Sequence, residues 1–170
     1  MKTKIPLIIL ILFLATGILS YKYLSLRNQQ INLINKAKYN FTDHLSSSLI
    51  FANKIDINKN TKVSKDSILP LLNMYEHISD ANIIAETFFN YDNHFALIDP
   101  TDMKEYQLTL SEILYKLSNN TVDDEDTVKM KLLMVDINLI YKYVNENDTF
   151  TMKKYITDLR PNLKIIKTSK

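Results

Sequence analysis

The feature that most constrains the fold of this 170-residue chain is its glycine content, because the sequence contains one glycine, Gly17. Glycine supplies the positive φ angles of many hairpin turns and bulges, and phosphate-binding loops and nucleophile elbows depend on it. The chain after residue 17 lacks these turns. The sequence therefore predicts an all-α protein and argues against P-loop, dinucleotide-binding and α/β-hydrolase folds.

An uninterrupted apolar run, IPLIILILFLATGIL, occupies residues 5–19. It follows Lys2 and Lys4, and it precedes Tyr21 and Tyr23, aromatic residues of the kind that favour headgroup depth. Counted through Leu24, it offers about 20 residues, enough for a helix to cross the roughly 30 Å hydrocarbon core of a bilayer. We expect residues 5–24 to form a single transmembrane helix that anchors the protein in the cell membrane.

Two other interpretations of this apolar run are open. A cleavable signal peptide would use residues 5–14 as its apolar core and the small residues at 15–17 as its cleavage site. A buried core helix of a soluble protein is the other possibility. The anchor is favoured because the run continues through Ile18 and Leu19, past the cleavage site, into a helical pattern. Lipid attachment at a processed cysteine is excluded because the chain has no cysteine.

The positive charges on the two sides of the apolar run are nearly equal, so they give little indication of its orientation in the membrane. Lys2, Lys4 and the amino terminus lie on one side, and Lys22 and Arg27 lie on the other. A short tail ahead of an export-like segment usually stays inside, so we expect the remaining chain to be extracytoplasmic. The abundance of Lys, Asn, Ile and Tyr is typical of an AT-rich bacterial genome, which predicts a bacterial envelope protein.

Composition divides the chain into three predicted parts: a membrane anchor over 1–23, a helical-bundle ectodomain over 24–160 and a basic flexible tail over 161–170. A hydrophobic content of 46% is sufficient for a packed core rather than disorder. Residues 71–126 carry 12 acidic and 2 basic residues, whereas the segments on either side are net positive. This pattern predicts that the middle helices pack beside the outer ones with complementary charge.

Apolar residues at spacings of three and four predict a bundle of four to five helices. Their expected ranges are 24–52, 67 to about 90–93, 100–118, 121 or 123 to about 144, and 148 or 149 to 160, and the polar segment 53–65 is expected to be a loop. The most regular stripes lie in the third and fourth of these helices, which we expect to form the antiparallel core. Leu110 and Ile137, near the stripe centres, are predicted to be fully buried.

Two acidic clusters coincide with predicted helix starts, at residues 99–102 and 123–126. Asp99 followed by Pro100 is a strong start signal, and acids in a first turn interact favourably with the helix dipole. Calcium binding at 123–126 is an alternative, although EF-hand spacing would need a central Gly and a terminal Glu that are missing. Asp99, Asp102 and Glu105 share one helical face and could also hold a cation or act as a carboxylate pair.

None of the three histidines, His44, His77 and His94, has a His or Glu partner three or four residues away. The HExxH and Glu-x-x-His patterns of metal-binding helices are therefore absent, and we expect surface or core-edge histidines. The basic segment 153–170 could contact anionic lipid or wall polymer, but a solvated tail is the expected state. Three glycosylation sequons, at Asn40, Asn119 and Asn147, are expected by chance in a chain this rich in asparagine.

These patterns predict no catalytic, cofactor-binding or metal-ligating residue, so an enzyme is disfavoured. We expect the ectodomain to act as a protein–protein interaction module that binds a protein partner through its helical faces, without nucleic-acid binding. The alternative is a ligand-binding or sensory bundle with a small-molecule pocket between helices, a plan that resembles bacterial sensor bundles in architecture alone. A pocket with converging tyrosine hydroxyls would favour the sensor, whereas an exposed apolar groove would favour the interaction module.

Overall fold

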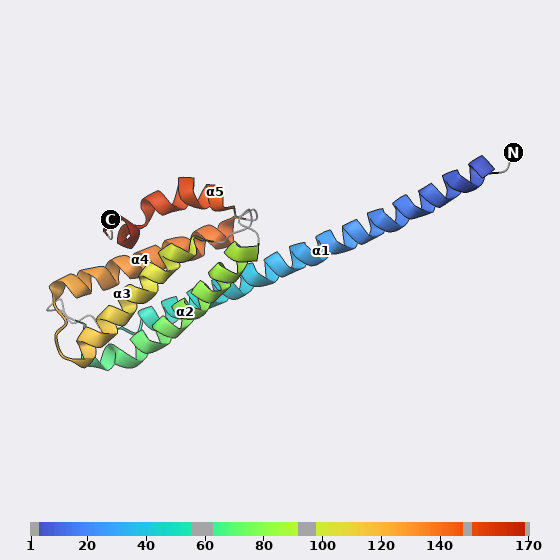
Figure 1. Cartoon of the computed structure of the whole chain (residues 1–170). Coiled ribbons are helices and arrows are strands. Elements are labelled where there is room, and N and C mark those ends of the chain that lie inside the picture. The colour runs from blue at the N-terminus through green and yellow to red at the C-terminus, as the bar shows by residue number, and fades with distance from the viewer. Residues whose placement is uncertain (1–3, 56–62, 92–97, 148–150, 169–170) are drawn as a thin grey trace. The chain divides into compact units, whose positions relative to one another are not determined.

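A computed structural model describes residues 4–55, 63–91, 98–147 and 151–168, with side chains outside the description at 4–11, 90–91 and 167–168. Within these ranges the chain forms six α-helices and no β-strand, which confirms the predicted all-α class (Figure 1). Backbone contacts divide the chain into two compact units, Met1–Lys36 and Ala37–Lys170. Helix α1 (Lys4–Ala52) contributes residues to both units.

The first unit contains the N-terminal part of α1. Its large apolar side chains with a described position, such as Leu12, Phe13, Ile18 and Leu19, are exposed. Within the part of the chain that the structure describes, no helix combines the length and the apolar character needed to cross a membrane. The side chains at positions 5–11 of the predicted span lie outside that part.

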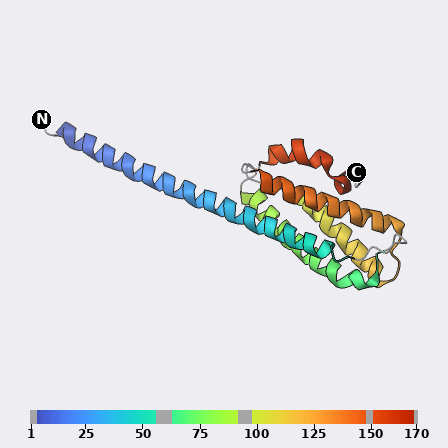
Figure 2. The ribbon, with the colours of Figure 1, turned by 180° about the vertical axis from the view of Figure 1, so that it is seen from behind.

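The second unit is a bundle built from the C-terminal part of α1, three long helices and a C-terminal segment of short helical pieces (Figures 1 and 2). The long helices are α2 (Ile68–Tyr91), α3 (Pro100–Ser118) and α4 (Asp124–Glu146), and a short 3-10 turn, η1 (Lys65–Ser67), precedes α2. The C-terminal segment comprises α5 (Met152–Lys154), the π-helical turn η3 (Tyr155–Leu159), the 3-10 turn η4 (Arg160–Asn162) and α6 (Lys164–Thr168).

Side-chain caps explain where α3 and α4 begin, as the sequence predicts. The Asp99 carboxylate accepts the backbone N–H of Thr101 at 2.9 Å, and Pro100 takes the first helical position, where no N–H is needed. Asp123 and Asp126 form a reciprocal capping box, each carboxylate accepting the other residue's backbone N–H at 3.0 Å. Both acidic clusters thus contribute helix caps.

The core follows the predicted stripes most closely in α3 and α4. Leu110 and Ile137 are completely buried, which confirms their predicted position. In α2 the apolar spacing predicts a buried face through Leu71, Tyr75, Ile78, Ala85 and Phe89. The structure differs, because Met74 is buried while Phe89 is 37% exposed. The most extensive backbone contact joins α2 to α3 rather than α3 to α4, so the centre of the bundle includes α2.

The end of the chain packs into the core where a solvated tail was expected. Leu163, Ile165 and Ile166 are buried, and α6 contacts both α3 and α4. The surrounding lysines suggested a solvated segment, but Lys164 is exposed while its apolar neighbours turn inward. The predicted loop 53–65 is likewise anchored by buried residues at 55 and 63, and its residues 56–62 lie outside the description.

Candidate functional site

Helices α2 and α3 carry exposed large apolar side chains at helical spacing. Leu72 and Ile83 on α2 are 43% and 57% exposed, and Leu108 and Tyr115 on α3 are 55% and 71% exposed. At 3.6 residues per turn, each pair falls within roughly 20° on its helical wheel. The four residues therefore form one stripe on each helix, and together we name them the α2–α3 face.

The two stripes flank the seam between the helices. The Gln107 side-chain amide donates to the hydroxyls of Tyr75 at 3.1 Å and Ser79 at 3.2 Å, which joins α3 to α2 across this seam. On each helical wheel these seam residues lie between the buried stripe and the exposed one. Leu72 and Ile83 on α2, and Leu108 and Tyr115 on α3, thus lie on the solvent side of the seam residues of their helices.

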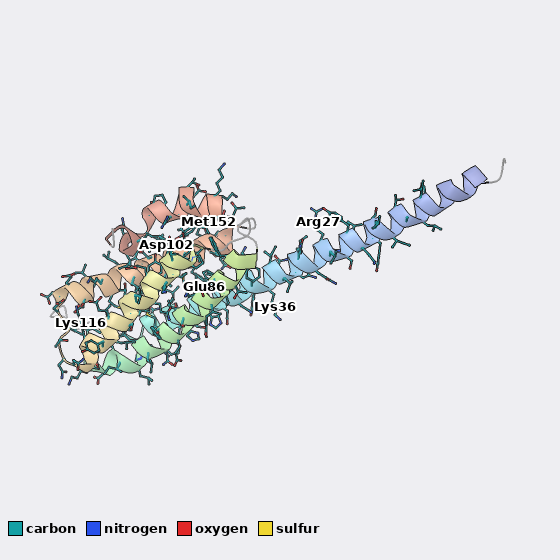
Figure 3. All side chains as sticks on the ribbon, viewed as in Figure 1. Arg27, Lys36, Glu86, Asp102, Lys116 and Met152 are labelled. Atoms are coloured by element: carbon teal, nitrogen blue, oxygen red, sulfur yellow. The ribbon has the colours of Figure 1, made fainter. Side chains whose placement is uncertain are left out.

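Acidic side chains accompany this face. Exposed Glu76 follows Leu72 on α2, and Glu86 lies farther along the same helix (Figure 3). On α3, Glu112 pairs with Lys116 at 3.2 Å, and Lys116 also reaches Asp126 at 2.7 Å. The hydrogen bonds from Lys116 to Asp126 and Glu112 raise the pKa of the lysine above its ordinary value. The face thus combines apolar side chains with a mainly acidic surround.

A cavity of about 210 Å³ lies between the C-terminal part of α1 and α4. It is lined by six residues that each carry a polar group: Tyr39, Thr42, Asp43, Ser46, Tyr141 and Asn145. Small-molecule sites are more often larger and mostly apolar, roughly 300–1,000 Å³. The cavity has the two tyrosines that a sensory pocket would offer, but its volume suits only a small polar ligand.

Asp102 has a role beyond helix capping. Its carboxylate is 4% exposed, accepts the Tyr155 hydroxyl at 2.5 Å and accepts the Arg160 guanidinium at 2.9 Å. Figure 3 places Asp102 near the start of α3, beside the C-terminal segment. Burial, followed by the hydrogen bond to Asp102, raises the pKa of Tyr155 well above its usual range. Because these groups satisfy one another, the predicted alternative of an open carboxylate pair at 99, 102 and 105 has no support.

A second buried carboxylate, Asp136 on α4, holds the beginning of α6. Its oxygens accept the backbone N–H groups of Lys164 and Ile165, each at 2.8 Å, and the Tyr106 hydroxyl lies 3.4 Å away. Burial raises the pKa of Asp136, against the lowering effect of these backbone hydrogen bonds. The sequence signal for this contact is an acidic residue inside an apolar stripe, which our sequence analysis did not use.

Two of the histidines meet between α1 and α2. The Nδ1 atoms of His44 and His77 are 3.2 Å apart, and His44 Nδ1 lies 3.6 Å from an Asp80 carboxylate oxygen. Phe51 stacks on the His77 ring at a centroid distance of 5.6 Å. His77 and Asp80 are three residues apart on α2, but the patterns expected of metal-binding helices pair histidine with His or Glu rather than Asp, and His44 belongs to another helix. His94, the third histidine, lies outside the described residues.

Comparison of the chain with protein-family models, curated proteins and solved structures gave no match.

Proposed function

We propose that the protein is a membrane-anchored envelope protein whose extracytoplasmic helical bundle binds a partner protein through the α2–α3 face. The observation that carries this proposal is the grouping of Leu72, Ile83, Leu108 and Tyr115 on both sides of one helix seam. Exposed apolar residues scattered singly are normal on any protein, whereas a grouped patch rimmed by polar residues is typical of an interaction site. No catalysis is proposed for this face.

The chemistry of the face specifies the partner. Its apolar centre favours a partner that presents an apolar ridge or helix face, and its acidic surround favours basic residues around that ridge. Gln107 and the two hydroxyls that it contacts offer hydrogen bonds at the centre. A partner with an apolar stripe flanked by lysine or arginine would meet all three features.

The experiment compares two pairs of charge-introducing substitutions. Ile83→Glu with Leu108→Glu alters the α2–α3 face, whereas Val128→Glu with Val135→Glu alters α4 at residues that are 53% and 49% exposed. A photo-crosslinking side chain at position 115 would report the contact in intact membranes. We expect the parent and the α4 variant to give the same crosslinked species and the face variant to lose it. Equal crosslinking in all three proteins would contradict the proposal.

The proposed membrane anchor is the N-terminal part, residues 1–23, whose apolar helix extends from residue 5 through residue 24. The proposed ectodomain is the helical bundle, residues 24–160. It rests on the length of the apolar run and its continuation past the possible cleavage site. Because the chain has no cysteine, one exposed substitution, Ser118→Cys, gives a single labelling site. We expect a carbonate-resistant, full-length protein that a membrane-impermeant maleimide labels on intact protoplasts. A shortened protein that carbonate extracts would contradict the anchor. Labelling only after lysis would show that the bundle lies on the cytoplasmic side.

The cavity between α1 and α4 supports a second candidate, a bundle that binds a small polar ligand. Tyr39 and Tyr141 on two different helices line it. The substitution Tyr141→Ala would widen the cavity and weaken the binding of such a ligand. It would leave crosslinking through the α2–α3 face unchanged. The cavity ranks second because its volume is small.

A further inference from the structure

Three potential ligand atoms converge between α1 and α2, outside the face proposed above. They belong to His44, His77 and Asp80, and all lie within 4.8 Å of one another. His77 and Asp80 are three residues apart on α2, which places them on neighbouring positions of one helical face. His44 completes the group from α1, so the cluster joins two helices of the second unit.

Two of the three separations between these atoms are close to those of a tetrahedral metal site, and the third lies within 4.8 Å. Zinc binds imidazole nitrogen and carboxylate oxygen at roughly 2.0–2.2 Å, so neighbouring ligand atoms of a tetrahedron are about 3.3–3.6 Å apart. The two separations measured at His44 Nδ1 are 3.2 Å to His77 Nδ1 and 3.6 Å to the Asp80 carboxylate. A cation could therefore be accommodated by small side-chain adjustments, without movement of either helix.

The same geometry also has a metal-free explanation. One imidazole can donate its Nδ1 proton to the other Nδ1, and the Asp80 carboxylate then balances any positive charge on His44. A shift of that proton to Nε2 exposes both Nδ1 lone pairs to a cation. The two states thus differ in tautomer rather than in fold, and stacking on Phe51 holds the His77 ring in place for either one.

We propose that His44, His77 and Asp80 form a binding site for a divalent transition metal, with zinc as the principal candidate. Two imidazoles and one carboxylate suit zinc and its first-row neighbours, whereas calcium and magnesium prefer all-oxygen sites. The His44 and Asp80 side chains are 27% and 55% exposed, so the fourth coordination position is open to water. Metal bound here would connect α1 to α2 and stabilise their pairing. The site is independent of the proposed partner surface.

The test measures binding of zinc chloride to the full-length protein in detergent, without a polyhistidine tag. Isothermal titration calorimetry should show one saturable site, and melting followed by circular dichroism should shift upward with zinc. His44→Gln, His77→Gln and Asp80→Asn should each weaken binding by about tenfold or more, because changes even in outer-shell groups cost 10–100-fold. Glu76→Gln, an exposed carboxylate beside His77, is the control that should keep the parent affinity.

Cobalt provides a second readout that folding defects cannot imitate. Tetrahedral Co²⁺ absorbs visible light far more strongly than the octahedral aqueous ion, so the parent should develop an intense band that zinc abolishes. Each ligand variant that melts cooperatively without metal should lose this band. Parent-like zinc affinity in all three ligand variants, or an octahedral cobalt spectrum in the parent, would overturn the assignment.

Discussion

Replacement of Asp136 separates the hydrogen-bonding role of a buried carboxylate from its charge. The residue is completely buried, and its Oδ2 atom accepts the N–H groups of Lys164 and Ile165 and lies near the Tyr106 hydroxyl. Asp136→Ala removes this acceptor altogether. Asp136→Asn keeps an acceptor oxygen in the same place and removes the charge.

The expected cost follows from the number of donors that lose their acceptor. Asp136→Ala leaves two backbone N–H groups without their acceptor, at a cost of about 1–3 kcal/mol each, and the loss of the 3.4 Å contact with the Tyr106 hydroxyl adds little. We therefore expect a loss of about 2–6 kcal/mol, a large share of the 5–15 kcal/mol typical of a domain. Asp136→Asn should stay within about 1 kcal/mol of the parent at pH 7, since relief of the buried charge offsets any poorer hydrogen bond.

The difference in stability between Asp136→Asn and the parent also has a predictable pH dependence. Burial raises the folded-state pKa of Asp136 above its unfolded value, so the ionised form is disfavoured by folding. The contribution of this group to stability is therefore greatest below the unfolded pKa and declines as pH rises through the folded pKa. Asparagine lacks this titration, so the stability of Asp136→Asn relative to the parent should increase between pH 4 and pH 7.

Urea unfolding followed by circular dichroism, at pH 4 and pH 7, measures all three proteins. The midpoint should fall markedly for Asp136→Ala and little for Asp136→Asn. If the asparagine variant were as unstable as the alanine variant at pH 7, the ionised charge rather than the acceptor geometry would hold α6. That result would refute the reasoning.

Four further substitutions test the core, the ion pair and the cap, each by urea unfolding at pH 7. Leu110→Ala and Ile137→Ala should each cost about 2–5 kcal/mol, because both side chains are fully buried. Asp102→Asn should cost about 2–4 kcal/mol, because it removes the charged partner of the largely buried Arg160 guanidinium. Asp123→Ala should cost about 1 kcal/mol through loss of the α4 capping box.

Matched controls distinguish these effects from general damage to the bundle. Leu108→Ala removes the same atoms as Leu110→Ala from an exposed position, so it should change stability by less than about 0.5 kcal/mol. Asp123→Ser retains a capping oxygen and should keep most of the parent stability. If both buried alanine variants unfolded at the parent midpoint, the assigned core of α3 and α4 would be wrong.

Three features were predictable from the sequence because local chemistry determines them. They are the all-α class, the helix caps and the apolar stripes of α3 and α4. The missing glycines exclude most alternatives to helix, and the Asp99 cap acts over only two residues. Helix α2 was harder, because its apolar residues surround much of the helix and several registers bury a comparable number. Its buried face includes Met74 and Ala81. Which side of α2 is buried depends on the neighbouring helices rather than on the sequence of α2 alone.

The contacts of the candidate sites were less accessible to sequence analysis because they join distant residues. His44 and His77 are 33 positions apart, and Asp102 and Arg160 are 58 apart. No spacing rule within a helix reveals such pairs without the tertiary arrangement. The buried Ile165 illustrates the same limit, since its lysine-rich surroundings predicted solvent exposure.

The buried carboxylates of Asp102 and Asp136 affect the order in which the folded bundle can be completed. Asp102 and Asp136 lie on α3 and α4, but their partners belong to residues 155–165, which a ribosome adds later. Until those residues arrive, an assembled interior would hold two carboxylates away from water without their donors. The nascent bundle should therefore stay loosely packed, and thus accessible to proteases, until its C-terminal segment docks.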